Sequence, residues 1–315
     1  RIRERESSVR KLDIYTTRAY YAFAIVNSRG ISSGDYGTIF FEWLDLDIEK
    51  NGVHGKGVDF YITRSIDHEA LLRTSDVALE MARESLKARK IDAPFVGDVL
   101  LEPMALDAIL WPLWYNVSAL NVQEGRSRFI GMIDKDVANK KFTMYDDGTL
   151  PEGIATHRCD DEGVPTQKKV VIEKGVLRTY LYDTYTAYRE NRQSTGNAKR
   201  RNYKSQPQPG VTNLVMESTV SKRLDELVGE IDKGVLLRGE ILGSHLINPI
   251  KGAMAITCLN ALYIEDGDIK YPIKAITMSD DYFEFLKKID IVGGEFRLVP
   301  DGKLAPVIAR NVHFG

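Results

Sequence analysis

Alternation of apolar and polar residues is strongest near the start of the chain. The segments 13–26, 35–49 and 58–65 are rich in β-branched and aromatic residues, which favour strands. Between them, 27–30 has the composition of a turn, and 51–57, which contains three glycines, has that of a loop. The pattern predicts a meander of antiparallel strands.

Helical periodicity replaces this alternation after Asp67. In 68–90, apolar residues recur every three or four positions, and Asp67 is a residue type that caps helix N-termini. A strand over 95–101 and an apolar helix over 102–119 follow. Pro112 lies inside this second helix, where its missing N–H predicts a kink or an end to the first half.

Beyond residue 125, turn signals recur at short intervals between short strand-like runs, which predicts a β-rich domain. Hairpins are predicted within 170–182, turning at Lys174 and Gly175, and within 262–271, turning at Asp266 and Gly267. Short amphipathic helices are predicted at 219–232 and 280–290.

The predicted fold class is therefore α+β. An N-terminal strand meander with helices precedes a large β-rich, antiparallel domain of barrel or sandwich type. We place the domain boundary between 1–92 and 93–315.

Composition narrows the range of functions. The chain has 315 residues, 43% of them hydrophobic, and a formal net charge of −2. A net charge this small does not attract nucleic acid or an anionic membrane strongly. No apolar run reaches the ~18 residues that a membrane helix needs, and no signal peptide is visible. We expect a cytoplasmic protein without nucleic-acid or membrane partners, and the start at Arg1 suggests an internal point of a longer parent.

Metal ligands are scattered along the chain. His68 and Glu69 begin like a HExxH motif, but Leu72 stands where the second histidine belongs, so this zinc motif is incomplete. Cys159 and Cys258 form no CxxC pair, and we expect two free buried thiols.

One loop holds a denser set of donors. His157, Cys159 and Asp160 stand close together, and His245 could join them across strands of the β-rich part. Two interpretations are open: a stand-alone hydrolase site, or a polar loop that leads into a hairpin.

A second polar run combines small hydroxyl residues, a glycine and cations. It comprises Ser194, Thr195, Gly196 and Asn197, followed by Lys199, Arg200 and Arg201. Backbone N–H groups and arginine side chains in such a run could bind a carboxylate or phosphate. A charged surface loop is the alternative.

Several of these segments together resemble the TldD/PmbA family, the modulators of DNA gyrase. The matching segments are DDGT at 146–149, DDEGVPTQ at 160–167, KGVLRTYLYD at 174–183, STGNAKR at 194–200, the Thr-Asn pair at 212–213 and GSHLINPIKG at 243–252. The resemblance covers nearly the whole chain, and it implies a further N-terminal region that this chain lacks.

In one branch of the family, a HExxxH helix motif and a distant cysteine hold zinc. Aligning the leucine-x-proline start of that helix places Trp111 at the first histidine, Pro112 at the catalytic glutamate and Asn116 at the second histidine. Gly243 or Ser244 stands at the cysteine. The resemblance therefore implies no catalytic residue and no metal or other cofactor in this chain.

The pattern resembles the metal-free, TldE-like branch. This implies a non-catalytic partner of a zinc-bearing TldD-like subunit, and the two subunits together degrade unfolded peptides. When the partner is absent, we expect a homodimer through the β-rich domain. Candidate peptide- or partner-binding residues are Ser194, Thr195, Gly196, Asn197, Arg200, Arg201, Ser244 and His245. A gyrase-type protein-binding modulator and the stand-alone hydrolase are the alternatives.

Overall fold

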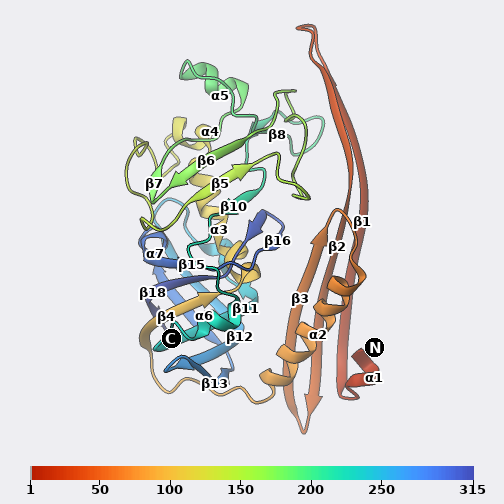
Figure 1. The fold of residues 1–315 in the computed structure, drawn as a ribbon, viewed down its shortest axis with the longest axis vertical. Helices are drawn as coiled ribbons and strands as arrows, with labels where there is room; N and C mark the ends of the chain where they lie inside the picture. The colour runs from red at the N-terminus through yellow and green to blue at the C-terminus, as the bar shows by residue number, and fades with distance from the viewer. Residues whose placement is uncertain (1) are drawn as a thin grey trace.

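The N-terminal part of the computed structural model, which describes residues 2–315, is a three-stranded antiparallel sheet with one covering helix (Figure 1). Its elements are α1 (Ile2–Arg5), β1 (Val9–Val26), β2 (Ser32–Lys50), β3 (Val53–Thr63) and α2 (His68–Ser85). The sheet order β1-β2-β3 confirms the predicted meander. The hairpin of β1 and β2 projects far beyond β3, the third strand of this sheet.

The predicted loop over 51–57 is wrong beyond its first two residues. Asn51 and Gly52 turn with positive φ, and β3 already starts at Val53. The two later glycines are needed inside the strand, because a Cβ on Gly57 would clash with the carbonyl oxygen of Ala78 in α2. Gly55 meets α2 in the same way. These glycines mark close helix–strand packing and not a loop.

Helix α2 begins as predicted, because the Asp67 carboxylate accepts hydrogen bonds from the N–H groups of Glu69 and Ala70. It ends earlier than the predicted residue 90, at Ser85. Its buried face packs on the N-terminal sheet, and this small core consists of Ile2, Leu44, Leu46, Ile48, Ala78, Leu79 and Ala82.

The C-terminal part is built on a closed five-stranded barrel, so the barrel alternative of the prediction is confirmed. Strand pairing runs around the ring in the order β4-β18-β14-β12-β11 and back to β4. The bounds are β4 Phe95–Leu101, β11 Lys233–Leu242, β12 Ala253–Glu265, β14 Ile276–Asp281 and β18 Val307–Phe314, with β13 (Asp268–Ile273) and β15 (Ile289–Val292) paired outside the ring. The β4–β11 pair is parallel and the other pairs of the ring are antiparallel.

A second, six-stranded sheet and a short ribbon complete the C-terminal part. The sheet contains β16 (Arg297–Val299), β17 (Gly302–Leu304), β10 (Leu214–Met216), β5 (Met144–Asp147), β6 (Lys168–Glu173) and β7 (Val176–Leu177), and the ribbon pairs β8 (Ala198–Lys199) with β9 (Gln208–Pro209). Both predicted hairpins are confirmed, and positive φ angles at Lys174, Gly175, Asp266 and Gly267 form their turns.

The helices of the C-terminal part are short apart from one. They are α3 (Pro103–Val117), α4 (Ala119–Gln123), α5 (Thr184–Arg189), α6 (Leu224–Val228), the 3₁₀ turn η1 (Ser244–Leu246) and α7 (Tyr282–Lys288). The prediction for 280–290 is confirmed by α7, whereas the helix predicted over 219–232 shrinks to α6. The N–H groups of Thr219 and Val220 bond to Val292 of β15 instead of starting a helix.

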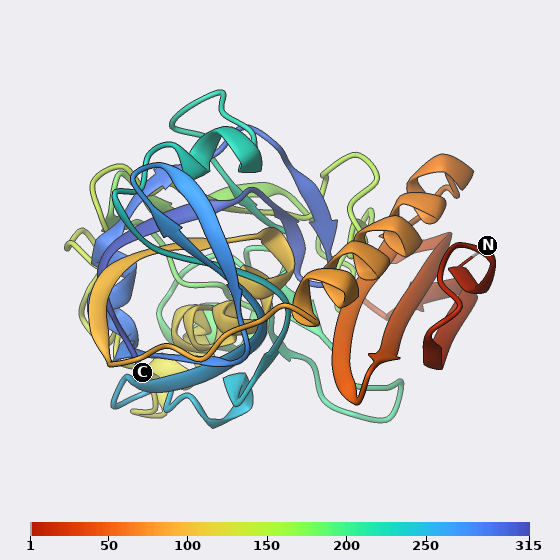
Figure 2. The same cartoon turned by 90° about the horizontal axis from the view of Figure 1, so that it is seen from below.

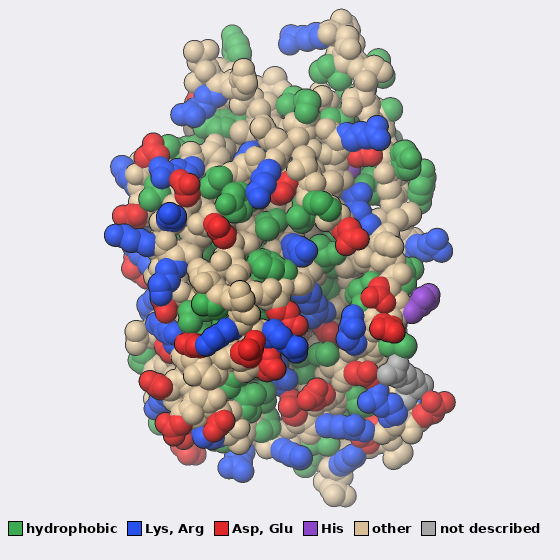
Figure 3. All heavy atoms as spheres, viewed as in Figure 1, with side chains coloured by type: hydrophobic (Ala, Val, Ile, Leu, Met, Phe, Trp, Pro, Cys, Tyr) green, Lys and Arg blue, Asp and Glu red, His purple; other side chains and the backbone are tan. Residues whose placement is uncertain are grey.

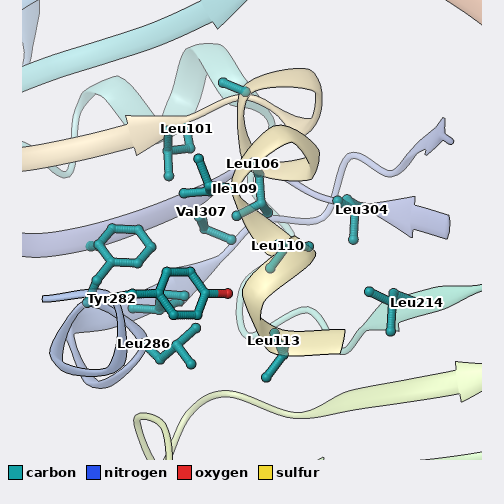
Figure 4. Packing of buried hydrophobic residues seen from close by; sticks show 14 of the residues in the cluster. Leu101, Leu106, Ile109, Leu110, Leu113, Leu214, Tyr282, Leu286, Leu304 and Val307 are labelled. Atoms are coloured by element: carbon teal, nitrogen blue, oxygen red, sulfur yellow. The ribbon is translucent and has the colours of Figure 1, made fainter. Parts of the chain in front are cut away.

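Helix α3 does not end at Pro112 but continues to Val117. Seen from below, it lies within the ring of barrel strands (Figure 2). Its apolar residues pack against the barrel and α7, as the labelled side chains of Leu106, Leu110, Leu113, Tyr282 and Val307 show (Figure 4). This packing holds the helix, because burying each large apolar side chain contributes about 1.5–3 kcal/mol.

Among residues 2–315, no helix combines the length and apolarity that crossing a bilayer requires. Acidic and basic side chains are interspersed over the face shown in Figure 3, in keeping with the small net charge.

Candidate functional site

The C-terminal half of α3 meets the turn η1, and this contact joins two segments that the sequence singles out. The indole N–H of Trp111 donates to the carbonyl oxygen of Ser244 at 2.7 Å. The Trp111 ring makes edge contacts with Trp114 and Tyr115, at centroid separations of 6.4 and 6.3 Å. Trp111 and Trp114 are partly buried against the main core. An aromatic cluster therefore occupies the junction of α3 and η1.

Asn116 is fully buried, and its amide is saturated. Its Nδ2 donates to the carbonyl oxygens of Pro112 (2.7 Å) and Pro249 (2.6 Å). Its Oδ1 accepts from the N–H of Arg128 at 2.6 Å and from the Ser127 hydroxyl at 3.2 Å. This side chain fixes two loops around the helix end and has no free atom for a ligand.

The turn that carries Gly243 is itself a backbone feature. Gly243 has φ 80° and precedes η1, where a side chain would be strained. Ser244 is half-buried and His245 is exposed. Four residues at the aligned positions thus lie close to this junction. Their groups are an indole (Trp111), a pyrrolidine ring (Pro112), an amide (Asn116) and, at Gly243, no side chain.

The STGN run folds into the interior. Thr195 accepts from the N–H of Tyr182 at 2.8 Å and donates to Asn197 Oδ1 at 2.7 Å, and the N–H of Gly196 donates to Ser194 Oγ at 3.2 Å. Gly196 has φ 69°, and a Cβ there would press on the carbonyl oxygen of Pro165. The hydroxyl and amide groups of the run are therefore engaged inside the protein.

Asn197 leads to a buried carboxylate. Its Nδ2 donates to Asp146 Oδ2 at 2.7 Å, and Asp146 is completely buried. Lys169 Nζ lies 2.9 Å from the same oxygen, and Thr212 donates its N–H (2.5 Å) and hydroxyl (2.9 Å) to Oδ1. Sequence reasoning missed Lys169, although two adjacent lysines in a strand place one on the inner face.

The neighbouring Asn213 extends the same network. Its Nδ2 donates to the carbonyl oxygen of Asp147 at 2.7 Å, and its Oδ1 accepts from the N–H of Ala155 at 2.9 Å. The DDGT turn, the STGN run and the Thr-Asn pair therefore share one buried polar hub, which organises the loops. A role of Ser194, Thr195, Gly196 and Asn197 in binding stays a prediction.

The cations after the STGN run reach solvent. Arg200 and Arg201 are exposed, and the Arg200 backbone N–H donates to Asp161 Oδ2 at 2.6 Å. Their part in binding a peptide or partner also stays a prediction.

The donor-rich loop after residue 156 packs against the β1–β2 hairpin close to its turn. His157 stands edge-on to Tyr21 and Phe23, at 5.1 and 5.5 Å, and its Nδ1 lies 3.9 Å from Asp35 Oδ2. Burial, assisted by the positive charge of Arg64, lowers the pKa of His157. This histidine is therefore mainly neutral at pH 7.

The neighbours of His157 have structural partners. Cys159 Sγ accepts from Ser33 Oγ at 3.2 Å, and the Asp160 carboxylate accepts from the N–H groups of Glu162, Val164 and Ala198 at 3.0 Å each. Within residues 2–315, no hydrogen bond joins Cys159 to a histidine. The contacts of Cys159 therefore do not form the bonded pair of nucleophile and base that a cysteine hydrolase uses.

The two cysteines are free and buried, as predicted. Cys258 is buried in β12 and donates to the carbonyl oxygen of Arg238 at 3.2 Å, whereas His245 is exposed. Burial raises the pKa of Cys258 to about 12. Across the described part of the chain, no group of three or more His, Cys, Asp or Glu side chains is arranged to hold a metal ion.

A domain model for metallopeptidases fits this architecture. The model described as the PmbA/TldA metallopeptidase C-terminal domain matches residues 96–315, which contain the barrel and the polar hub. The chain belongs to the PmbA/TldD family.

Sequence relatives include proteins described as metalloproteases. An uncharacterized protein of Methanocaldococcus jannaschii is 37% identical over 67% of this chain and 49% of its own length. A metalloprotease TldD homolog of Buchnera aphidicola is 34% identical over 56% of this chain and 36% of its own length. The chain thus spans half or less of the length of these relatives.

Solved structures share the fold. TldE from Thermococcus kodakarensis superposes with a TM-score of 0.89 at 24% identity, covering 100% of this chain and 71% of that one. A Thermotoga maritima structure, described as that of a DNA gyrase modulator, gives 0.91 at 24% identity with the same coverage. At this identity, the likeness establishes the fold alone.

Proposed function

We propose that this chain is a non-catalytic, peptide-binding subunit of a TldD/TldE-type zinc metallopeptidase. The observation that carries the proposal is the chemistry of α3, where Trp111, Pro112 and Asn116 stand at the positions that the family resemblance aligns with HExxxH. Zinc in proteins takes histidine, cysteine and carboxylate ligands, and activating water requires the bound metal. The Trp111 and Asn116 side chains instead bond to neighbouring backbone.

A zinc-bearing TldD-like relative is the partner in this proposal, and an unfolded peptide is the substrate. Strand addition suits such a substrate, because main-chain hydrogen bonds do not depend on its sequence. The edge of β1 supports this role, since β2 is its only paired strand among residues 2–315. Tyr15 and Tyr20 on β1 are 65% and 71% exposed. An unprotected edge of this length favours pairing with another chain.

Reconstitution tests the proposal. The chain and a zinc-bearing, HExxxH-containing relative are purified separately, then assayed alone and mixed for cleavage of an unstructured fluorogenic peptide. We expect no cleavage by this chain alone and cleavage by the mixture that exceeds that of the relative alone. Cleavage that is unchanged by adding the chain would remove the partner role.

A matched pair of variants locates the contact. Tyr20→Glu on β1 is expected to weaken the stimulation, whereas Tyr188→Glu on α5, also exposed, leaves it unchanged. Homodimers in the unmixed sample that disappear on mixing would further support a shared interface.

A further inference from the structure

A cleft of about 960 Å³ separates the N-terminal part from the barrel. One wall comes from β3 and α2, and the other from the segment around β16 and from α6. Its size falls within the range of small-molecule sites, which form preferentially at domain interfaces. It lies at the N-terminal end of α3, where Glu102 and Pro103 line it, and Trp111 is absent from its lining.

Glu102, the N-cap residue of α3, is one of two buried carboxylates in the cleft lining, with Asp59. It is 6% exposed, and its Oε1 accepts the N–H of Gly239, which has φ 68° at an irregularity in β11. Oε2 accepts no hydrogen bond from the described residues, and Glu102 is one of the residues that line the cleft. A nearly buried carboxylate in the cleft wall therefore has one oxygen without a donor.

The charges beside Glu102 do not balance. Asp59, which is 3% exposed, accepts from Arg297 at 2.7 Å, and Arg238 pairs with Glu84 of α2. When all are ionised, three carboxylates thus face two guanidinium groups. An uncompensated buried charge is costly, so either a proton or an external cation must supply the missing positive charge.

Over its whole lining the cleft also carries more acidic than basic side chains, and it has apolar walls. Seven carboxylates and four arginines line the cleft. Apolar side chains run between the charged groups and include Ile62, Val77, Met81, Phe296 and Leu298. A ligand that matches this lining carries a positive group on an apolar stem.

We propose that this cleft binds a small organic cation, an amine or guanidinium on an apolar stem, with its charged end on Glu102 Oε2 and its stem between Val77 and Leu298. Ammonium and guanidinium groups donate several hydrogen bonds to carboxylates. A Mg²⁺ or Ca²⁺ ion fits less well, because such ions need several converging oxygen ligands and the described residues form no such group.

Titration calorimetry with n-butylamine and n-pentylamine tests this assignment, with 1-pentanol as the uncharged probe and MgCl₂ as the inorganic one. We expect saturable binding of at least one amine at one site per chain, and no binding of 1-pentanol or Mg²⁺. Glu102→Gln should weaken the amine at least about tenfold. Asp268→Asn on β13, whose side chain is 78% exposed and lies outside the cleft lining, should change the affinity less than about twofold.

A second variant separates binding from folding. Ala70→Trp fills the mouth from α2 while leaving Glu102 intact, and it should also abolish binding in a protein whose circular dichroism is unchanged. Burial, with Asp59 beside it, raises the pKa of Glu102. Asp59, Arg297, Arg238 and Cys258 all face this carboxylate.

Three results would overturn the assignment. They are no saturation by either amine up to about 10 mM, equal affinity in wild type and folded Glu102→Gln, and stoichiometric Mg²⁺ binding that competes with the amine.

Discussion

Trp111 donates its indole N–H to the carbonyl oxygen of Ser244 across 2.7 Å, and this bond ties α3 to η1. The family resemblance aligns these two segments with the metal-binding helix and the distant cysteine. They lie far apart in the sequence and touch in the fold. In this chain, a hydrogen bond between an indole and the backbone joins them.

Replacing Trp111 with Phe should therefore lower the free energy of unfolding. The lost hydrogen bond leaves the Ser244 carbonyl without this donor, at a cost of about 1 kcal/mol. Trp43→Phe is the control, because Trp43 is also partly buried but its indole has no hydrogen-bond partner among the described residues. Urea unfolding of both variants measures the difference, and equal losses would contradict the role of this bond.

The buried pair of Asp146 and Lys169 predicts a larger effect. Asp146→Ala leaves the Lys169 ammonium buried without its partner and also removes the acceptor of Asn197 and Thr212. Breaking such a pair costs about 3–5 kcal/mol. Asp225→Ala, an exposed acid, should stay within about 0.5 kcal/mol of wild type. A loss below about 1 kcal/mol for Asp146→Ala would show that the hub contributes little to stability.

Close packing of β3 on α2 predicts that Gly57→Ala is destabilising. The added methyl would meet the Ala78 carbonyl, and overpacking of this kind costs about 1–3 kcal/mol. Gly229→Ala provides the matched control, since Gly229 has helical φ −64° and only the Glu226 oxygen nearby, at 3.4 Å. That change should be neutral or stabilising by about 0.4–1 kcal/mol. Thermal unfolding of both variants tests the pair, and similar melting temperatures would argue against the close contact.

Asp107 on α3 predicts a pH-dependent stability. Its Oδ1 is buried without a partner, and burial, aided by the charge of Asp301, raises the pKa of Asp107 to about 8. The folded state thus holds a proton that the unfolded chain releases near pH 4, so this group lowers stability as pH rises from about 4 to 8. Asp107→Asn should raise the free energy of unfolding more at pH 8 than at pH 4.5.

Urea unfolding at these two pH values measures that change. A gain of the same size at both values would show that the Asp107 carboxyl titrates normally in the folded protein.

Local pattern was enough to predict most of the architecture. Period-2 alternation identified the β1–β3 meander. Asp67 marked the start of α2, and the turn residues at 174–175 and 266–267 marked the two hairpins. The helix expected at 219–232 failed because Thr219 and Val220 pair with β15, a contact distant in sequence. The loop expected at 51–57 was wrong for a related reason. Gly55 and Gly57 are needed because α2 packs closely on β3, and not because the chain turns there.

The candidate site was predictable only through the family motifs. The motif residues indeed meet, but in a buried hub around Asp146 that their spacing does not reveal. The sequence did not predict a role for Glu102 or Asp59, because each is a single acid in an apolar run. Each becomes part of the cleft through a partner more than 100 positions away.

Metal content of the purified chain is the most direct test of the central claim, that α3 and η1 offer no zinc site. After incubation with excess ZnSO₄ and dialysis, elemental analysis should find far less than one zinc per chain. A zinc-bearing relative treated in parallel should retain about one, as a site with nitrogen and sulfur ligands does. One tightly held zinc per chain that is lost in Trp111→Ala and Asn116→Ala would contradict the account.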